Sequence, residues 1–318
     1  MIDLIKLRKK NISDTEKSIL IEKSNLKQQT AQGKTYFDNA TTKNFEGGFY
    51  INIDAENTLK VEGSLHKYYN WLQSKKLLNN NRFTITQAYQ TFKNLIENKG
   101  FEPQGVLVTQ FEIGANIPIS IDAKIVLSKV LYISVFEDLS IKKPFMINPK
   151  YRDARHITTY FNRGIKIYYR MYDKHFEMRM KEKATPNGAN IIRIETVNLN
   201  VQKTLLTDFM KLKSLTLQKI NFQKKWDKVY FDFEVEAPSG TNLIKINIAK
   251  EILLNGIFAT VEKYKSLRAA KNITERGART ILEFCKDWNE NRHLFLMKQT
   301  ETSKTWKNAY ISEIQQLN

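Results

Sequence analysis

Residues 105–119 read GVLVTQFEIGANIPI, a stretch in which polar and apolar side chains alternate on either side of a central acid. A period of two is typical of a β-strand, because successive side chains of a strand point to opposite faces of the sheet. One face carries Glu112, Gly114 and Asn116, and the other carries Phe111, Ile113 and Ala115. An acid within an otherwise apolar strand costs free energy unless it is paired or binds a cation. This strand therefore predicts a sheet with a charged position on one face.

The same alternation, and apolar stripes at helical spacing, predict further elements along the chain. Strands are expected at 1–7, 48–54, 58–63, 156–161, 164–172, 191–199 and 228–236, and helices at 86–99, 122–131, 246–267 and 272–288. Thr86 and Gly100 are the expected caps of the first helix, and Asn272 with Glu275 forms a capping-box pattern at the start of the last. We predict an α+β fold, with a mostly antiparallel sheet and helices on one face over residues 1–205. A largely helical part follows over residues 206–318.

The chain is strongly basic, with 51 Lys and Arg against 33 Asp and Glu among 318 residues. Such an excess favours partners that are polyanions, chiefly nucleic acid or an anionic membrane surface. The alternative is that a Lys- and Asn-rich composition reflects an AT-rich genome. No apolar run reaches the ~20 residues that span a bilayer, so we expect no membrane role. The single cysteine, Cys285, cannot form an internal disulfide, which fits the reducing cytoplasm of a bacterial cell.

The segment 164–178, GIKIYYRMYDKHFEM, concentrates basic and aromatic side chains on one face of a predicted strand. That face carries Lys166, Tyr168, Arg170 and Tyr172, a combination suited to phosphates and to stacked, unpaired bases. The alternative is that these tyrosines fill the rim of a core. No phosphate-binding loop of the GxxxxGK[ST] type and no CxxC pair occurs, so ATP hydrolysis of that kind and zinc fingers are not supported.

A second acid lies in the segment 191–200, IIRIETVNLN, where Ile192 and Ile194 alternate with Arg193 and Glu195. Two strands that carry acids, together with a strand that ends in a tyrosine, are typical of a metal-dependent sheet that cleaves phosphodiesters. The alternative for each acid is a salt bridge within the sheet, for example between Glu195 and a nearby Arg or Lys.

The order of these blocks is similar to that of rolling-circle replication initiators, the filamentous-phage gene II/X type and the trans-acting plasmid type. The resemblance spans residues 1–205. It consists of the opening strand MIDLIKLR, LKVEGSLHKYYN as a V-x-G-S block, VTQFEIGANI as the acid-bearing strand, TTYFNRGIKIYYRMYDKHFEM as the Y-x-K-x-x-E block and IIRIETVNL as the L-R-[FI]-E strand. The chain has Gln110-Phe111-Glu112 where the common pattern is Arg-Ile-Asp, and it lacks the paired histidines of the wider nickase class.

The resemblance implies a metal-dependent endonuclease that nicks one DNA strand at a phage or plasmid origin and can rejoin it. Tyr172 is the implied nucleophile, which would form a 5′-phosphotyrosine and free a 3′-OH for DNA synthesis, and Lys174 is an implied phosphate contact. The candidate ligands of Mg²⁺ or Mn²⁺ are Glu112, His175, Glu177 and Glu195. The candidate DNA contacts are Lys166, Tyr168, Arg170 and Arg193.

The implied partners are single-stranded or origin DNA and the host helicase and polymerase, and the pattern is compatible with an oligomer. The basic run KYKSLRAAK at 263–271 and the helix after it are a further candidate surface for duplex DNA, or else a solvated helix face. Two other functions use the same features. One is a non-catalytic DNA- or RNA-binding protein in replication or copy control, and the other is a relaxase or transposase that uses the same phosphotyrosine chemistry.

Overall fold

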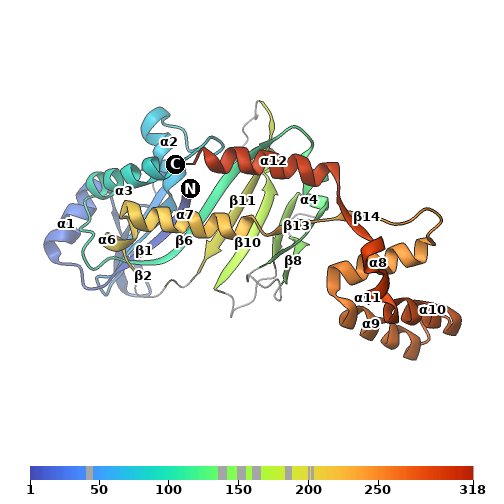
Figure 1. The fold of residues 1–318 in the computed structure, drawn as a ribbon. Coiled ribbons are helices and arrows are strands. Elements are labelled where there is room, and N and C mark those ends of the chain that lie inside the picture. Colours follow the sequence, from blue (N-terminus) through green and yellow to red (C-terminus); the bar gives the residue numbers. More distant parts are fainter. Residues whose placement is uncertain are drawn as a thin grey trace. The chain divides into compact units, whose positions relative to one another are not determined.

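The fold was analysed in a computed structural model, which describes residues 1–40, 46–134, 142–148, 155–159, 166–182, 188–199, 201 and 204–317 (Figure 1). The chain forms two compact units. The larger comprises Met1–Tyr230 and Thr305–Asn318, and the smaller comprises Phe231–Lys304. The larger unit thus continues past residue 205, the predicted end of the first domain. It also includes the C-terminal segment.

A single antiparallel sheet, which has 13 strands within the described residues, dominates the larger unit. Its strands are β1 Ile2–Lys9, β2 Lys27–Ala31, β3 Lys34–Asp38, β4 Phe49–Ile53, β5 Leu59–Ser64, β6 Leu107–Ile119, β7 Val130–Ser134, β8 Lys142–Ile147, β9 His156–Thr159, β10 Ile167–Asp173, β11 Asn190–Asn198, β12 Thr204–Leu205 and β13 Val229–Phe231. Their order is β13-β7-β8-β9-β10-β11-β6-β1-β5-β4-β3-β2, and β12 pairs with β6. The strands quoted above, β6, β10 and β11, are therefore neighbours at the centre of the sheet.

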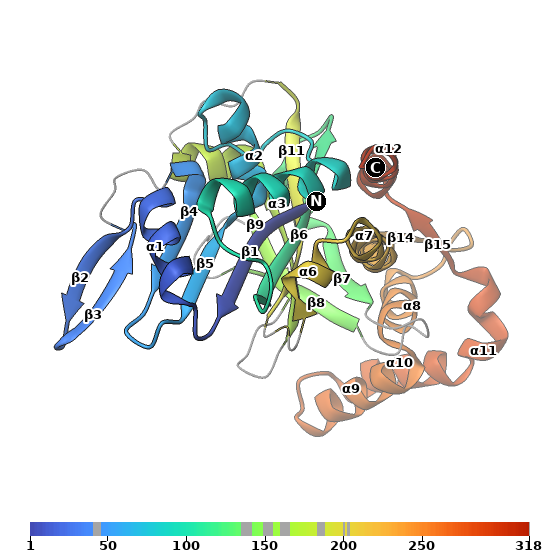
Figure 2. The same ribbon diagram turned by 90° about the vertical axis from the view of Figure 1, so that its left-hand side faces the viewer.

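Helices pack against this sheet. The helices of the larger unit are α1 Asp14–Lys23, α2 Leu65–Ser74, α3 Ile85–Lys99, α4 Ala123–Ser128, α5 Lys174–Glu177, α6 Leu206–Phe209, α7 Leu212–Trp226 and most of α12 Glu301–Gln315, with short turns at Glu46–Gly48 and Met178–Glu182. Figures 1 and 2 show α3, α7 and α12 lying along the same side of the strands. The Tyr310 hydroxyl of α12 donates to the Gln223 carbonyl of α7 at 3.3 Å.

Aromatic side chains fill the layer between these helices and the sheet. Phe111 of β6 lies 4.9 Å from Phe209, and Tyr169 of β10 meets Trp226 edge-on at 6.0 Å. The indole N–H of Trp226 donates to the Thr196 hydroxyl of β11 at 3.0 Å, so the ring is buried with its polar group paired. The apolar positions of the central strands thus face α6 and α7, and the polar positions face the other way.

The smaller unit is largely helical. It contains α8 Leu243–Asn255, α9 Ile257–Ala269, α10 Glu275–Lys286, α11 Trp288–Asn291, a 3₁₀ turn Arg292–Leu294, the start of α12 and a two-stranded sheet of β14 Phe233–Glu236 and β15 Leu296–Gln299. Its core gathers Ile248, Ile252, Phe284, Trp288 and Phe295. Within the described part of the chain, no helix combines the length and apolar character needed to cross a membrane.

Most of the predicted elements are confirmed, and several are corrected in their bounds or caps. The predicted helix 246–267 is two helices, because Gly256 adopts φ 83°, a left-handed conformation that ends α8. The predicted strand 228–236 is two strands, one in each sheet. The helix predicted to start at Asn272 starts at Glu275, and its cap is Thr274, whose hydroxyl accepts from the Gly277 amide. Of the strands predicted at 156–161 and 164–172, residues 160, 161, 164 and 165 lie outside the described residues.

The start of α3 provides a test of the local structure. Thr84, not the predicted Thr86, is the N-cap: its hydroxyl accepts from the Gln87 amide, and the Gln87 side chain accepts from the Thr84 amide. Because Thr84→Ala removes the hydroxyl that accepts from the Gln87 amide, we expect it to lower the free energy of unfolding by ~1 kcal/mol. The measurement is urea denaturation. Thr86→Ala, one position inside the helix and exposed, is the control; an equal cost for the two variants would contradict the assignment.

Candidate active site

The polar face of the central strands carries a continuous chain of five charged side chains. Acids and arginines alternate along it, in the order Asp3, Arg193, Glu195, Arg170 and Glu112. β1, β11, β10 and β6 each supply at least one of these side chains, and the period of two within each strand puts them on the same face. The predicted sharing of a face by Glu112, Gly114 and Asn116 is confirmed by their contacts with the two arginines.

Arg193 lies at the centre of this charge chain and is only 1% exposed. Its Nε donates to Glu195 Oε1 at 2.7 Å, one terminal nitrogen donates to Asn116 Oδ1 at 2.8 Å, and the other pairs with Asp3. Gly114 makes room for it, since a Cβ there would lie 3.1 Å from both the Arg193 guanidinium and the Glu195 Cγ. A buried guanidinium with this many partners fixes the carboxylates around it.

Arg170 connects the two remaining acids through a single nitrogen. That nitrogen lies 2.8 Å from Glu112 Oε2 and 2.5 Å from Glu195 Oε2, so the two carboxylates converge on one point. The Arg170 side chain is 24% exposed, whereas Glu195 is almost fully buried. Arg170 is therefore the solvent-facing end of a group of charges that otherwise lies inside the protein.

The two glutamates respond differently to this environment. Burial, together with the negative charge of Glu195, raises the pKa of Glu112 to about 7 despite the attraction of Arg170. Burial also opposes ionisation of Glu195, but Arg170 and Arg193 together hold the pKa of Glu195 below its usual range. The difference arises because Glu195 contacts two guanidiniums and Glu112 contacts one that it shares. Glu195 is thus ionised at neutral pH, whereas Glu112 is partly protonated at the same pH.

Tyr172 projects from β10 into the same group of side chains. Its hydroxyl donates to Glu195 Oε1 at 2.8 Å, and its ring stacks on His156 with centroids 5.1 Å apart. The residue is 6% exposed. Burial, and then the adjacent Glu195, raise the pKa of Tyr172 well above its usual value of 10, so the phenol keeps its proton at rest. Glu195 is positioned to accept that proton when the phenol oxygen reacts.

Lys174 follows two residues later, in α5, which Asp173 caps. Its ammonium donates to Glu177 Oε2 at 2.7 Å and to Asn79 Oδ1 at 2.6 Å, and the side chain is 1% exposed. Asn79 also donates to Asp3 at 3.2 Å. Lys174 thus joins the charge chain through Asn79.

The four predicted metal ligands are not gathered in one place. Glu112 and Glu195 converge at Arg170, whereas Glu177 pairs with Lys174 on α5. His175 is buried, which lowers its pKa, and its Nε2 makes no hydrogen bond to the described residues. Within the ranges that the structure describes, no group of three or more His, Cys, Asp and Glu residues is arranged to hold a metal ion.

The predicted DNA contacts differ in accessibility. Lys166 is exposed, and Tyr168 is half-buried with the Arg170 guanidinium 5.8 Å from its ring centre. Arg193 is enclosed and fully engaged by the groups around it, so this position does not fit a direct contact with DNA. Arg193 instead organises the acids.

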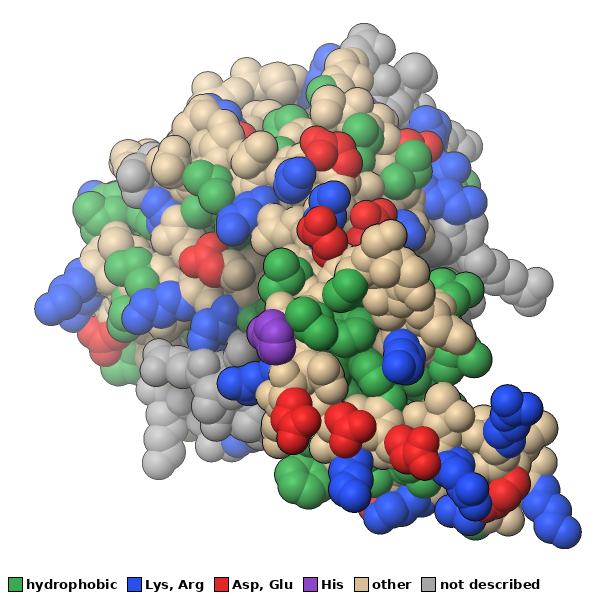
Figure 3. Space-filling view, turned by 45° about the vertical axis from the view of Figure 1, so that its right-hand side comes forward, with side chains coloured by type: hydrophobic (Ala, Val, Ile, Leu, Met, Phe, Trp, Pro, Cys, Tyr) green, Lys and Arg blue, Asp and Glu red, His purple; other side chains and the backbone are tan. Residues whose placement is uncertain are grey.

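The basic run of the smaller unit is largely balanced by acids. Lys263 pairs with Glu251, Lys265 with Glu262, and Arg268 with Glu275. Figure 3 shows the same interspersion of Lys and Arg (blue) with Asp and Glu (red) on this unit. Exposed pairs of this kind contribute less than ~1 kcal/mol each, so they do not prevent these cations from meeting phosphates.

Three members of the site were not singled out from the sequence. Asp3 carries the signal that marked Glu112, a lone acid in an apolar strand, and could have been found in the same way. Asn79 lies in a loop with no periodic signal. His66 is buried, with Nε2 2.6 Å from Asn81 Oδ1, and burial together with Arg193 lowers its pKa to about 3, so it is neutral.

In comparisons with known proteins, no protein-family model matches the chain, and no curated protein matches it. The resemblance predicted from the sequence rests on the residue blocks alone. Four of those blocks contribute Asp3, Glu112, Tyr172 and Glu195, which the fold brings into one group.

The raised pKa of Glu112 predicts a pH-dependent stability. The folded protein holds this proton up to pH about 7, whereas the unfolded chain releases it near pH 4.5. The resulting stabilisation is complete below the unfolded pKa and is lost as the pH rises through the folded pKa, by at most ~1.4 kcal/mol per pH unit. We therefore expect the free energy of unfolding of the wild type to fall, relative to Glu112→Gln, between pH 5 and pH 8.

Urea denaturation across that pH range measures this difference. Glu56→Gln, at an exposed position, is the control and should follow the wild type throughout. If the free energy of unfolding depended on pH in the same way for the wild type and Glu112→Gln, the assignment of the proton to Glu112 would be contradicted.

Proposed function

We propose that this protein is a DNA-nicking and -joining endonuclease that initiates replication, with Tyr172 as its nucleophile. The observation that carries the proposal is the 2.8 Å hydrogen bond from the Tyr172 hydroxyl to Glu195, a carboxylate that two arginines keep ionised. A phenol is a weak nucleophile unless a base takes its proton. The strongly basic chain supports a polyanionic substrate.

The proposed reaction transfers a phosphoryl group from DNA to the enzyme. The Tyr172 oxygen forms a bond to phosphorus, and its proton passes to Glu195. The bond from phosphorus to the 3′ oxygen breaks, and this oxygen takes a proton from water, whose hydroxide is neutralised by the proton that Glu195 releases. The products are a 5′-phosphotyrosine and a free 3′-OH. Reversal of the same steps rejoins the strand, because the phosphotyrosine conserves the energy of the phosphodiester.

Arg170 is the residue proposed to meet the scissile phosphate. It is the accessible end of the charge chain, and a guanidinium binds phosphate oxygens in a bidentate manner. Tyr168, beside it, would support an unpaired base, and the exposed Lys166 would contact the backbone. Arg193 and Lys174 act from inside, where they hold Glu195 and Asn79 in place.

The proposed reaction also uses a divalent cation, which would bind where the two glutamates converge. Mg²⁺ is commonly held by one or two carboxylates, with substrate phosphates and water as its other ligands. Glu112 and Glu195 would hold the ion in place of the Arg170 guanidinium nitrogen, which now bridges them. When bound, it would polarise the phosphate and stabilise the negative charge of the transition state. Glu177 and His175 are not part of this proposed site.

One observation favours a second function, that of a non-catalytic DNA- or RNA-binding protein. Tyr172 is 6% exposed and its pKa is raised, as expected for a tyrosine that serves only to pair a buried acid. In that case the charge chain would be a structural element, and the basic surface alone would bind nucleic acid. Nicking by Tyr172 requires its hydroxyl to become accessible when DNA binds.

A cleavage assay separates the two functions. Overlapping, labelled single-stranded oligonucleotides from the replicon that encodes the chain would be incubated with the wild type and Mn²⁺. We expect a covalent protein–DNA adduct and a new 3′-OH end at one position. Tyr172→Phe should reduce both below detection, because the phenyl ring has no oxygen to attack phosphorus.

Tyr168→Phe is the matched control. It alters a neighbouring tyrosine on the same face of β10 and should retain the adduct. Binding of the same oligonucleotides should persist in both variants. If the wild type leaves every oligonucleotide intact while binding it, the endonuclease proposal fails and the non-catalytic function stands.

A further inference from the structure

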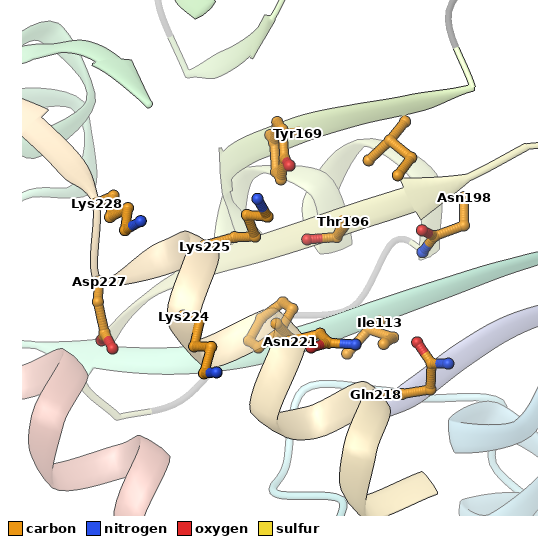
Figure 4. A pocket seen from close by; sticks show the side chains of 12 residues that line it. Ile113, Tyr169, Thr196, Asn198, Gln218, Asn221, Lys224, Lys225, Asp227 and Lys228 are labelled. Carbon is orange, nitrogen blue, oxygen red and sulfur yellow. The ribbon is translucent and has the colours of Figure 1, made fainter. Parts of the chain in front are cut away.

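A cavity lies on the opposite face of the sheet from Tyr172. It measures about 580 Å³ and lies between α7 and strands β6, β10 and β11 (Figure 4). Its volume is in the range of sites that hold small molecules. Its lining consists of Ile113, Ile167, Tyr169, Thr196, Asn198, Gln218, Asn221, Phe222, Lys224, Lys225, Asp227 and Lys228.

The cavity has an apolar part and a part rich in amides. Tyr169, Phe222 and Ile113 supply flat or apolar surface. The side-chain amides of Asn198, Gln218 and Asn221 make no hydrogen bond to the described residues, and neither does the Tyr169 hydroxyl. Amides present donors and acceptors together, which is the combination needed to read the edge of a nucleobase.

The third part of the cavity is cationic. Lys224, Lys225 and Lys228 line it against a single acid within the described lining, Asp227, which also interacts with Tyr310. Figure 4 shows the Lys225 side chain extending toward Tyr169 and Thr196. Lys143 approaches from β8, with its ammonium 5.9 Å from the centre of the Tyr169 ring.

Lys143 and Lys225 lie close enough for their positive charges to repel one another. Burial, and then the charge of Lys225, lower the pKa of Lys143. Like charges held together in a partly enclosed site are stabilised by an anion that binds between them. Because the amides and the apolar surface lie beside this cationic end, the anion would be attached to a larger group.

We propose that this cavity binds a nucleoside phosphate, with the phosphate at Lys225 and Lys228 and the base against Tyr169 and Phe222. Asn198, Gln218 and Asn221 would read the polar edge of the base. A free nucleotide and the terminal nucleotide of a DNA strand present the same chemistry. The site lies on the far side of the sheet from the proposed nucleophile, so the inference does not depend on nicking.

Isothermal titration calorimetry tests the proposal with four probes: AMP, dTMP, inorganic phosphate and a 5′-phosphorylated oligothymidylate. We expect saturable binding of at least one nucleotide, with inorganic phosphate at least tenfold weaker. Lys225→Gln and Asn221→Ala should each weaken nucleotide binding, the former at least tenfold. Tighter binding of the oligonucleotide would identify a strand end as the ligand, and equal binding would identify a free nucleotide.

Two control variants keep the test specific. Lys213→Gln removes an exposed cation from α7 outside the cavity and should leave binding unchanged. Tyr172→Phe should also bind as the wild type does, which separates this site from the proposed nicking site. The proposal is overturned if no nucleotide binds, if phosphate alone binds as tightly, or if Lys225→Gln and Lys213→Gln bind alike.

Discussion

The larger unit depends on how one buried guanidinium is neutralised. Arg193 lies on β11 at the centre of the sheet, and its contacts reach Asp3 on β1, Asn116 on β6 and Glu195 on its own strand. A charge in this position is tolerated only when its partners surround it. The strands must therefore align so that these side chains share one face. This requirement also explains Gly114, where a side chain would crowd the guanidinium.

The same constraint divides the sheet into two surfaces with different chemistry. On one, Arg193 holds Glu195, Glu195 accepts a hydrogen bond from the Tyr172 hydroxyl, and Arg170 extends the charge chain to the solvent. On the other, aromatic residues pack under α6 and α7 and leave a cationic cavity at one end. A single central strand such as β10 serves both surfaces, because Tyr169 and Tyr172 point to opposite sides of it.

Much of this arrangement could be predicted from the sequence, because alternation along β6, β10 and β11 is a local signal. This alternation predicted the strands, their polar faces and the central acids. Two results are not local. The pairing of Glu195 with two arginines depends on strand order, and the enclosure of Arg193 depends on Asn79, a loop residue 114 positions away in the chain. The salt-bridge alternative for the acids describes the structure better than the predicted cluster of four metal ligands. The break at Gly256 was missed because the apolar stripe continues through it.

The account makes Arg193 the residue on which the central sheet depends, and the free energy of unfolding of Arg193→Met tests this most directly. Methionine fills a similar volume but leaves Asp3 and Glu195 buried beside an uncharged side chain. We predict a loss of ~3–5 kcal/mol in urea denaturation at pH 7. Lys6→Met, which breaks an exposed pair with Glu62, should cost less than ~1 kcal/mol. An equally small cost for Arg193→Met would contradict the account.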